Sequence, residues 1–321
     1  RSLLRFEGDE GLDGPPALLV DNREWTGDVG LLEFLRDVGK HVTVGTMLAK
    51  ESVRSRLSSE QGISFTEFSY MLLQANDFFE LHDRYGCEMQ VGGSDQWGNI
   101  TAGIDLIRRR AGATAHGLTL PLLTRSDGAK FGKTADAAVW LDPARTLPYE
   151  LHQYFRNVDD RDVEQYLLRL TLVDVDDVAA VMADHASHPE ERLAQQRLAD
   201  EVCALVHGED ETNRARLAAE GLFAGSAPTI DALDALRGIV PETEVAATDL
   251  EGEESLVDAL VASGLCSSRG DARRTIGGGG VSVNGVRQDD SATRLPADAL
   301  VGGRYVLLQK GRRSRHLLVA D

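Results

Sequence analysis

The spacing of apolar residues changes along the chain and divides it into regions of different predicted structure. In the first region, short apolar runs at residues 89–91 and 118–123 have the length of buried strands, and a stretch with helical spacing separates them. A strand, a helix and a second strand in this order are typical of α/β layers. We therefore predict an α/β domain over residues 1–145.

From residue 146 the apolar residues recur with the helical period alone. The last of the predicted helices is expected to begin near Pro189, because proline is favoured in a first helical turn and the following Glu190 and Glu191 complement the helix dipole. We predict an all-helical domain over residues 146–235. Its expected helices cover residues 146–157, 162–170, 173–184 and 189–207.

Residues 236–255 are predicted to form an acidic linker. Within them, residues 241–255 hold six acidic residues, no basic residue and few side chains that could pack. A capping loop is the alternative interpretation.

The last region, residues 256–321, is predicted to be a small α+β domain. A helical pattern ends at a turn near Gly264, and Ser268 is expected to cap a second helix. The pair Asn284-Gly285 between apolar positions predicts a β-hairpin. Further expected features are strands over residues 305–309 and 316–319, and a loosening effect of the glycine run at 277–280.

Composition supports a multidomain globular protein and shows an uneven charge. The 321 residues are 42% hydrophobic, enough for two or three domains, and no apolar run has the length of a membrane span. Three widely separated cysteines show no metal-ligand spacing, so we expect a cytoplasmic protein without a bound metal. The net charge is −18, but residues 256–321 hold ten Lys/Arg and six Asp/Glu, so that region carries +4 and the rest −22. A basic module on an acidic body indicates an anionic partner such as nucleic acid.

The segment Gly128-Ala-Lys-Phe-Gly-Lys-Thr has the composition of a polyphosphate-binding loop. Its glycines allow close backbone approach, and Lys130, Lys133 and Thr134 supply mobile ammonium and hydroxyl groups. Gly128 and Gly132 enclose three residues, whereas a P-loop has four at this point, which argues against an ordinary P-loop nucleotidase. An exposed lysine-rich turn is the alternative.

A second group of candidate residues lies on one predicted helix. Tyr70, Gln74 and Asp77 are spaced i, i+4 and i+7 and therefore share one face of a helix that is otherwise largely apolar. Such a polar stripe can bind a small polar ligand. It can equally be a hydrogen-bond network inside the core.

A third group follows the predicted strand at residues 89–91. Gly93, Asp95 and Gln96 stand in a glycine-rich turn, and the carboxyl ends of strands in open α/β sheets are where ligands bind. We expect these residues to contact ribose or carboxylate groups. The alternative is a plain turn in which Asp95 caps the next helix.

The basic module contributes the fourth group. Arg269, Arg273 and Arg274 share one face of the helix that Ser268 caps, and Arg287 beside the hairpin can join them. Arginine forks match phosphate geometry, so this cluster favours binding to a structured RNA backbone. A solvated charged face is the alternative.

Taken in order, these segments resemble bacterial tyrosyl-tRNA synthetases over essentially the whole chain. The segments are Phe34-Leu-Arg-Asp-Val-Gly-Lys-His, Gly62-Ile-Ser-Phe-Thr-Glu-Phe-Ser-Tyr, Gly92-Gly-Ser-Asp-Gln-Trp-Gly-Asn, Lys130-Phe-Gly-Lys-Thr and Val139-Trp-Leu-Asp-Pro. The resemblance implies the C-terminal half of a Rossmann-like nucleotide-binding domain, a helical anticodon-binding domain and a small RNA-binding domain of the ribosomal-protein type. It also implies activation of L-tyrosine by ATP with Mg²⁺ as substrate, no tightly bound cofactor, transfer to tRNA(Tyr), and a homodimer with its interface around residues 31–68, which includes Phe65.

The resemblance also implies a role for each candidate residue. Tyr70 and Gln74 would hold the tyrosine ammonium, and Asp77 the phenol. Gly93 and Asp95 would hold the adenylate ribose, and Gln96 the carboxylate region. The residues implied to stabilise the leaving pyrophosphate are Lys130, Lys133 and Thr134, a variant of the class I Lys-Met-Ser-Lys-Ser signature.

One departure from the family pattern changes the expected activity. The His-x-Gly-His signature is absent, since His116-Gly117 is followed by Leu118. Residue 1 is therefore expected to fall inside the nucleotide-binding fold, and the chain alone is expected to be inactive. A non-catalytic RNA-binding protein derived from a synthetase, and a generic P-loop nucleotidase, are the other functions left open.

Overall fold

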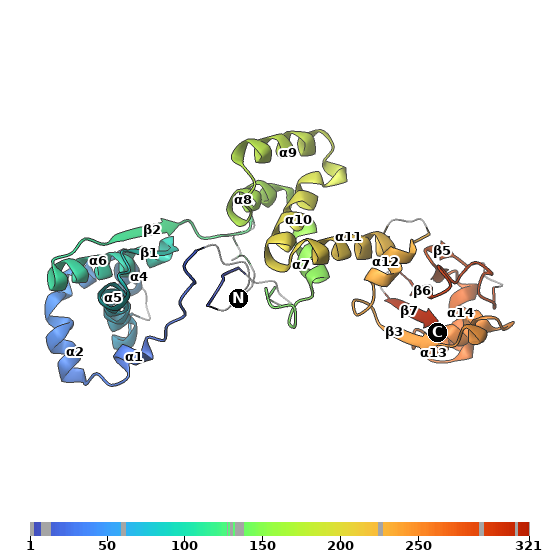
Figure 1. Cartoon of the computed structure of the whole chain (residues 1–321), viewed down its shortest axis with the longest axis horizontal. Helices are drawn as coiled ribbons and strands as arrows, with labels where there is room; N and C mark the ends of the chain where they lie inside the picture. The colour runs from blue at the N-terminus through green and yellow to red at the C-terminus, as the bar shows by residue number, and fades with distance from the viewer. Residues whose placement is uncertain are drawn as a thin grey trace. The chain divides into compact units, whose positions relative to one another are not determined.

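The computed structural model describes residues 3–7, 14–58, 62–126, 128, 131, 138–223, 227–288, 292–311 and 314–320. The chain divides into two compact units, whose helices and strands are labelled in Figure 1. One is Arg5–Phe131, and the other combines Arg1–Leu4 with Gly132–Asp321. Across the described ranges, no helix is both long enough and apolar enough to cross a membrane.

The Arg5–Phe131 unit is built on two long helices that pack together. Helix α5 (Phe65–Tyr85) begins with a capping box between Ser64 and Glu67 and ends at Gly86, which adopts the left-handed conformation (φ 68°). Its partner is α6 (Trp97–Ala111), and Phe78 of α5 and Leu106 of α6 are fully buried in their common core. The shorter helices are α1 (Arg23–Thr26), α2 (Leu31–Asp37), η1 (Gly39–His41), α3 (Val44–Leu48) and α4 (Glu51–Leu57).

Strands β1 (Met89–Gly93) and β2 (His116–Leu120) are parallel neighbours joined through η2 (Ser94–Gln96) and α6. The predicted α/β character of this region is thus confirmed. The second strand, however, was predicted at residues 118–123 and lies two to three residues earlier. Pro121 lacks the N–H that a longer ladder needs, and Gly117 allows the strand to pack closely on Ile100 of α6.

The other unit begins with helices, as predicted. They are α7 (Pro148–Arg156), α8 (Asp160–Leu170), α9 (Val175–Ser187), α10 (Leu193–His207), α11 (Glu209–Phe223) and α12 (Ile230–Ala235). The predicted start of a helix near Pro189 was wrong, because Pro189–Glu191 forms the short turn η3 and α10 starts after Arg192. Arg192 has a left-handed backbone (φ 54°), and its guanidinium donates hydrogen bonds to the carbonyls of Arg156 and Val158.

A five-stranded sheet in the order β3-β7-β6-β4-β5 completes this unit. The predicted hairpin is confirmed, with Asn284 and Gly285 both at positive φ between β4 and β5. Ser268 caps α14 as predicted, through the backbone N–H of Asp271. The bounds are β3 (Glu242–Val245), η4 (Ala247–Leu250), α13 (Ser255–Ala262), α14 (Arg269–Gly277), β4 (Val281–Val283), β5 (Val286–Arg287), β6 (Tyr305–Lys310) and β7 (Ser314–Ala320).

Part of the stretch predicted as an acidic linker belongs instead to the sheet. Its residues Glu242–Val245 form β3, which pairs in parallel with β7, and Val245 packs against the hydrophobic core. Along this edge strand, exposed acidic residues alternate with half-buried residues, which is the two-residue period of a strand. The prediction of a linker rested on the count of acidic residues and overlooked this period.

The glycine run at residues 277–280 was expected to loosen this domain, but it has a defined, hydrogen-bonded structure. The backbone N–H groups of Gly278, Gly279 and Gly280 all donate to carbonyls of the last turn of α14. Gly279 has a positive φ of 66°, and a Cβ atom there would clash with the guanidinium of Arg287. The run therefore closes α14 in a defined way and makes room for Arg287.

Helices α11 and α12 share a hydrophobic core with the sheet of this unit. Leu233 and Leu236, in and just after α12, are fully buried against Leu307 and Leu317 of β6 and β7. The hydroxyl of the buried Tyr305 also donates a hydrogen bond to Asp234 of α12. Helix α12 is thus fixed directly to the sheet.

Candidate functional site

Helix α5 brings the carboxylate of Asp77 against the short helix α1. The Trp25 indole donates a hydrogen bond from Nε1 to one carboxylate oxygen (2.8 Å), and the Asn22 amide donates from Nδ2 to the other (3.1 Å). Trp25 is buried, with 5% of its surface exposed. Two neutral donors therefore fix the orientation of the Asp77 carboxylate without cancelling its charge.

A chain of amides connects α5 to α6. Asn99 donates from Nδ2 to the Gln74 side-chain oxygen (3.0 Å) and to the Gln96 side-chain oxygen (3.3 Å). Gln74 and Gln96, predicted separately from the sequence, are thus held together by a residue that was not predicted. No sequence signal singled out Asn99 beyond its place in the same glycine-rich segment.

A cavity of about 670 Å³ opens beside this face of α5. Gln74 and Asp77 line it together with Asn22, Trp25 and Gln90. The side-chain oxygen of Gln90 is buried and has no hydrogen-bond partner in the part of the chain that is described. Asn22, Trp25 and Gln90 were missed by the sequence analysis.

Tyr70 does not line this cavity. It shares the face of α5 with Gln74, as the helical spacing predicted, but 58% of its surface is exposed. The predicted trio is therefore on one helix face, and only two of its members reach the cavity.

The turn after β1 brings Gly93 and Asp95 together. A Cβ atom at Gly93 would lie 2.8 Å from a carboxylate oxygen of Asp95 and 2.9 Å from Leu122, so only glycine fits. Asp95 does not cap α6, whose N-cap is Gln96 without a side-chain capping bond. The alternative capping role is thereby excluded, and the carboxylate lies at the carboxyl end of a parallel strand, where ligands bind in such sheets.

Lys130, Lys133 and Thr134 lie outside the described residues, so their roles stay predictions. Among the residues that are described, no group of three or more His, Cys, Asp or Glu side chains could hold a metal ion.

A second cavity, of about 540 Å³, lies among the helices of the other unit. Its lining includes His152, Arg156, Arg192, Arg216 and Phe223. No individual residue of this cavity was predicted from the sequence, although the helical region as a whole was assigned to RNA binding by resemblance.

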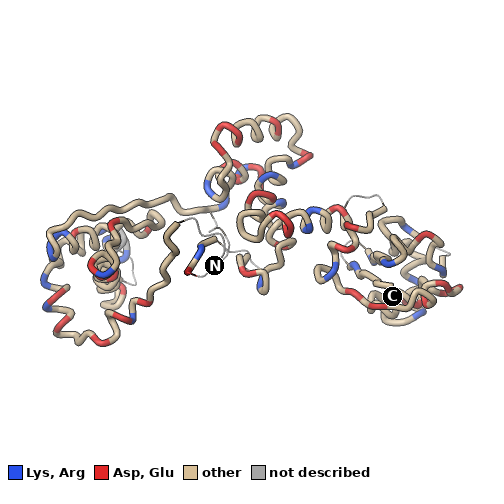
Figure 2. Tube along the Cα trace, in the orientation of Figure 1, with Lys and Arg blue, Asp and Glu red and all other residues tan. Residues whose placement is uncertain are grey.

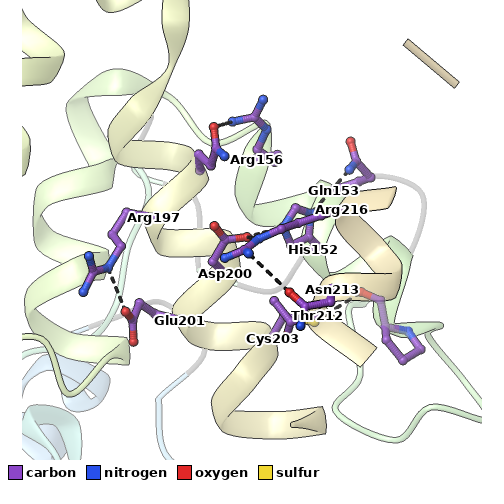
Figure 3. Close-up of polar contacts among 12 residues, drawn as sticks. His152, Gln153, Arg156, Arg197, Asp200, Glu201, Cys203, Thr212, Asn213 and Arg216 are labelled. Carbon is purple, nitrogen blue, oxygen red and sulfur yellow. Dashed lines mark hydrogen bonds and ion pairs between the residues drawn. The ribbon is translucent and has the colours of Figure 1, made fainter. Parts of the chain in front are cut away.

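Asp200 binds two of the residues that line this helical cavity, His152 and Arg216 (Figure 3). Its carboxylate accepts hydrogen bonds from His152 Nε2 and from Arg216 Nε, both at 2.8 Å. Burial would raise the pKa of Asp200, but the hydrogen bonds from these two residues outweigh it and hold that pKa below its ordinary value. The carboxylate is therefore charged at neutral pH and fixes both partners.

Arg156 of this cavity has a neutral hydrogen-bond partner. Its guanidinium donates to the neutral amide of Gln196 (3.2 Å), and burial lowers its pKa, although the nearby Asp200 opposes that shift. Phe223 at the cavity edge is 63% exposed and stacks with the guanidinium of Arg315, 5.0 Å from the ring centre. A partly desolvated cation and an exposed aromatic ring are suited to phosphate and base contacts.

The predicted arginine cluster is assembled on α14, but its charges are not free. Arg273 pairs with Glu254, and Arg269 pairs with both Glu254 (3.7 Å) and Asp258 (2.6 Å). Arg274 is 3.8 Å from Asp271, and Arg287 rests against Gly279. Figure 2 colours the acidic and basic positions along the trace.

Comparisons with known proteins identify the family. The family profile for class I tRNA synthetases (W and Y) matches residues 9–224, and that for the tyrosine–tRNA ligase SYY-like C-terminal domain matches residues 234–318. The tyrosine–tRNA ligase of Roseiflexus castenholzii is 52% identical over 305 residues, which is 94% of this chain and 72% of the relative. That of Anaeromyxobacter dehalogenans (strain 2CP-C) is 49% identical over 319 residues, covering 98% of this chain and 75% of the relative.

A solved structure supports the same assignment. A C-terminally truncated mitochondrial tyrosyl-tRNA synthetase from Coccidioides posadasii superposes with a TM-score of 0.51 at 36% identity, over 60% of this chain and 56% of that chain. The chain thus spans about three quarters of the curated relatives and somewhat more than half of the solved one. None of these matches supports the expectation that the chain is inactive, which stays a prediction. Their identity and extent show that the chain belongs to the tyrosine–tRNA ligases of the class I tRNA synthetases.

Proposed function

We propose that the cavity beside α5 is the tyrosine site of this ligase. The observation that carries the proposal is the Asp77 carboxylate, which faces a cavity while two neutral donors hold it in place. An ionised carboxylate has about four acceptor positions, so sites remain for a phenol O–H. In this assignment Gln74 binds the ammonium group of the substrate in the cavity. Tyr70, which is on the same helix face but outside the cavity lining, keeps its predicted ammonium contact as a separate part of the proposal.

This arrangement explains how phenylalanine is rejected. Phenylalanine fills the same volume but has no hydroxyl, so its binding would desolvate Asp77 without giving the carboxylate a new donor. Because Trp25 and Asn22 already fix the carboxylate, it cannot turn away to find another partner.

The reaction itself takes place next to this site, in what we assign as the C-terminal half of a Rossmann-like domain. The tyrosine carboxylate attacks the α-phosphorus of ATP, and the bond to pyrophosphate breaks. Gly93 and Asp95 hold the ribose, and Gln96 the carboxylate region. The residues assigned to the developing charge on pyrophosphate are Lys130, Lys133 and Thr134, with Mg²⁺ entering as part of the ATP substrate.

The second step requires tRNA(Tyr), and two surfaces are suited to it. A ribose hydroxyl of the tRNA attacks the tyrosyl carbonyl, and AMP leaves. We assign the helical cavity with Arg156 and Phe223 to the anticodon loop, and the α14 arginines with Arg287 to the RNA backbone. Contacts of this kind to phosphate give affinity that falls with salt.

The protein is further proposed to act as a cytoplasmic homodimer. Leu31, Leu32 and Leu35 on α2 and Phe65 at the start of α5 are 71, 83, 49 and 79% exposed. The three leucines lie within one short helix, and large apolar side chains exposed close together are typical of an interface. A sedimentation experiment tests this: a species of twice the chain mass is expected, and a monomer at micromolar concentration would contradict it.

Tyrosine-dependent exchange of pyrophosphate into ATP tests the assignment of the α5 site. Exchange that depends on tyrosine and is lost in Asp77→Ala supports it, whereas equal exchange in both proteins contradicts it. Absence of exchange in the unchanged chain would confirm the predicted inactivity. The assignment of the α5 site would then be tested by measuring tyrosine binding to the unchanged chain and to Asp77→Ala.

A further inference from the structure

One carboxylate joins the two arginines of the proposed RNA-binding face. Glu254 lies just before α13, and its two oxygens contact Arg273 and Arg269, which stand one helical turn apart on α14. Asp258, one turn further along α13, makes a second contact to Arg269 at 2.6 Å. The acidic groups therefore occupy the positions that RNA phosphates would need.

These ion pairs are weak enough to be exchanged. About half of each arginine side chain is exposed (59% for Arg269 and 49% for Arg273), and Glu254 is 38% exposed. Exposed pairs of this kind contribute little to stability because water and salt screen them. A phosphate that offers the arginine fork a bidentate contact can displace Glu254 without unfolding either helix.

In the proposed RNA contact, a phosphate must first displace Glu254 from the arginines. The strength of the contact therefore depends on where the phosphate lies. A well-placed phosphate binds both arginines at once. A phosphate that approaches from another direction meets a region whose charge is already cancelled. The acidic residues thus reduce the attraction for RNA in general more than for RNA of the right shape.

We propose that Glu254 is a specificity-determining residue that competes with RNA phosphates for Arg269 and Arg273. The proposal rests on the proposed RNA-binding role of the α14 face. It goes beyond that role because it assigns a function to an acidic residue, which is expected to weaken RNA binding while improving selectivity.

The test compares Glu254→Gln with Glu251→Gln in the full chain. Both substitutions remove one negative charge from the same segment, but Glu251 is exposed and makes no ion pair with any described residue. Filter binding is measured with a tRNA(Tyr) transcript and with a tRNA of unrelated sequence, from 50 to 200 mM KCl. Thermal melting of both variants verifies that they are folded.

Glu254→Gln is expected to bind the unrelated tRNA about three- to fivefold more tightly, with a smaller increase for tRNA(Tyr). Its plot of log affinity against log salt should be steeper by about one for each additional phosphate that the arginines bind, a change that a purely structural role would not produce. Glu251→Gln should show neither effect. In Arg269→Ala plus Arg273→Ala, adding Glu254→Gln should change nothing further.

Two results would overturn the proposal in distinguishable ways. Equal affinities and equal salt slopes for Glu254→Gln and Glu251→Gln would show that Glu254 does not compete, even if the double arginine variant binds RNA more weakly. If the double arginine variant binds both RNAs as well as the unchanged chain, the RNA-binding role of the α14 face is itself wrong.

Discussion

Two polar sites of this protein hold their charges in opposite ways. Beside α5, the Asp77 carboxylate is fixed by two neutral donors, and no described residue cancels its charge. On α14, Arg269 and Arg273 are exposed and are already paired with carboxylates. A sheltered, fixed and uncancelled charge is suited to one small ligand, whereas exposed and paired charges are suited to contacts that can be exchanged along a large polyanion.

The largest effect should come from removing the fixed carboxylate. Asp77→Ala is expected to lower the affinity for tyrosine by about 10- to 100-fold, because a hydrogen bond to a charged group contributes about 1.5–3 kcal/mol. Isothermal titration calorimetry measures this. The control is Asp83→Ala, at an exposed position on the same helix. Equal losses of tyrosine affinity in the two variants would show that the Asp77 carboxylate has no special role in binding tyrosine.

A similar carboxylate in the helical cavity should act on stability rather than on tyrosine. Asp200→Asn leaves the buried His152 and the exposed Arg216 without an ionised partner, so the free energy of unfolding should fall by about 1–3 kcal/mol at pH 7.

The sign of the pH dependence follows from the lowered pKa of Asp200. The contribution of this carboxylate is present in full above the ordinary carboxyl pKa of about 4 and is lost as the pH falls through the lower folded value. Denaturant unfolding should therefore show a large difference in the free energy of unfolding between Asp200→Asn and the unchanged chain at pH 7. At pH 3 this difference should be smaller. A constant difference would mean that the charge of Asp200 is unimportant.

A smaller effect is expected when one of the neutral donors is removed. Trp25→Phe keeps the aromatic packing but removes the hydrogen bond from the indole N–H to Asp77. We expect the binding free energy of tyrosine to weaken by about 1 kcal/mol, which is a three- to tenfold loss of affinity. Trp140→Phe, in the other unit, should leave tyrosine affinity unchanged. If Trp25→Phe binds tyrosine normally, the fixed orientation of Asp77 is not what the site requires.

The smallest effect belongs to the exposed charges. Arg273→Ala plus Arg274→Ala should weaken binding of tRNA(Tyr) about two- to fivefold and flatten its salt dependence. Arg108→Ala plus Arg109→Ala removes an equal charge from the end of α6 and should change the affinity less. Filter binding between 50 and 200 mM KCl distinguishes the two, and identical salt slopes would contradict a phosphate-binding role for α14.

Local chemistry explains which parts of the fold could be predicted. The cap at Ser268 and the hairpin at Asn284-Gly285 depend on neighbouring residues only, and both were predicted correctly. Strand β3 was missed because its acidic side chains resembled a linker, whereas its pairing with β7 is a contact between residues about 75 positions apart. Pro189 was misread because the turn η3 and the start of a helix have the same local signature.

The same distinction applies to the site. Gln74 and Asp77 were found because helical spacing alone places them on one face. Trp25 and Asn22 are more than 50 residues away from Asp77, so only the tertiary fold shows their hydrogen bonds to it. For the arginines on α14, the sequence predicted a shared face but could not show that Glu254 would be in contact with them.

The central claim is that Asp77 recognises the phenol of tyrosine. The most direct test is calorimetric binding of L-tyrosine and L-phenylalanine to the unchanged chain and to Asp77→Ala. We predict that the unchanged chain binds tyrosine much more tightly than phenylalanine, and that this preference largely disappears in the variant while phenylalanine binding changes little. A variant that retains the full preference for tyrosine would contradict the claim.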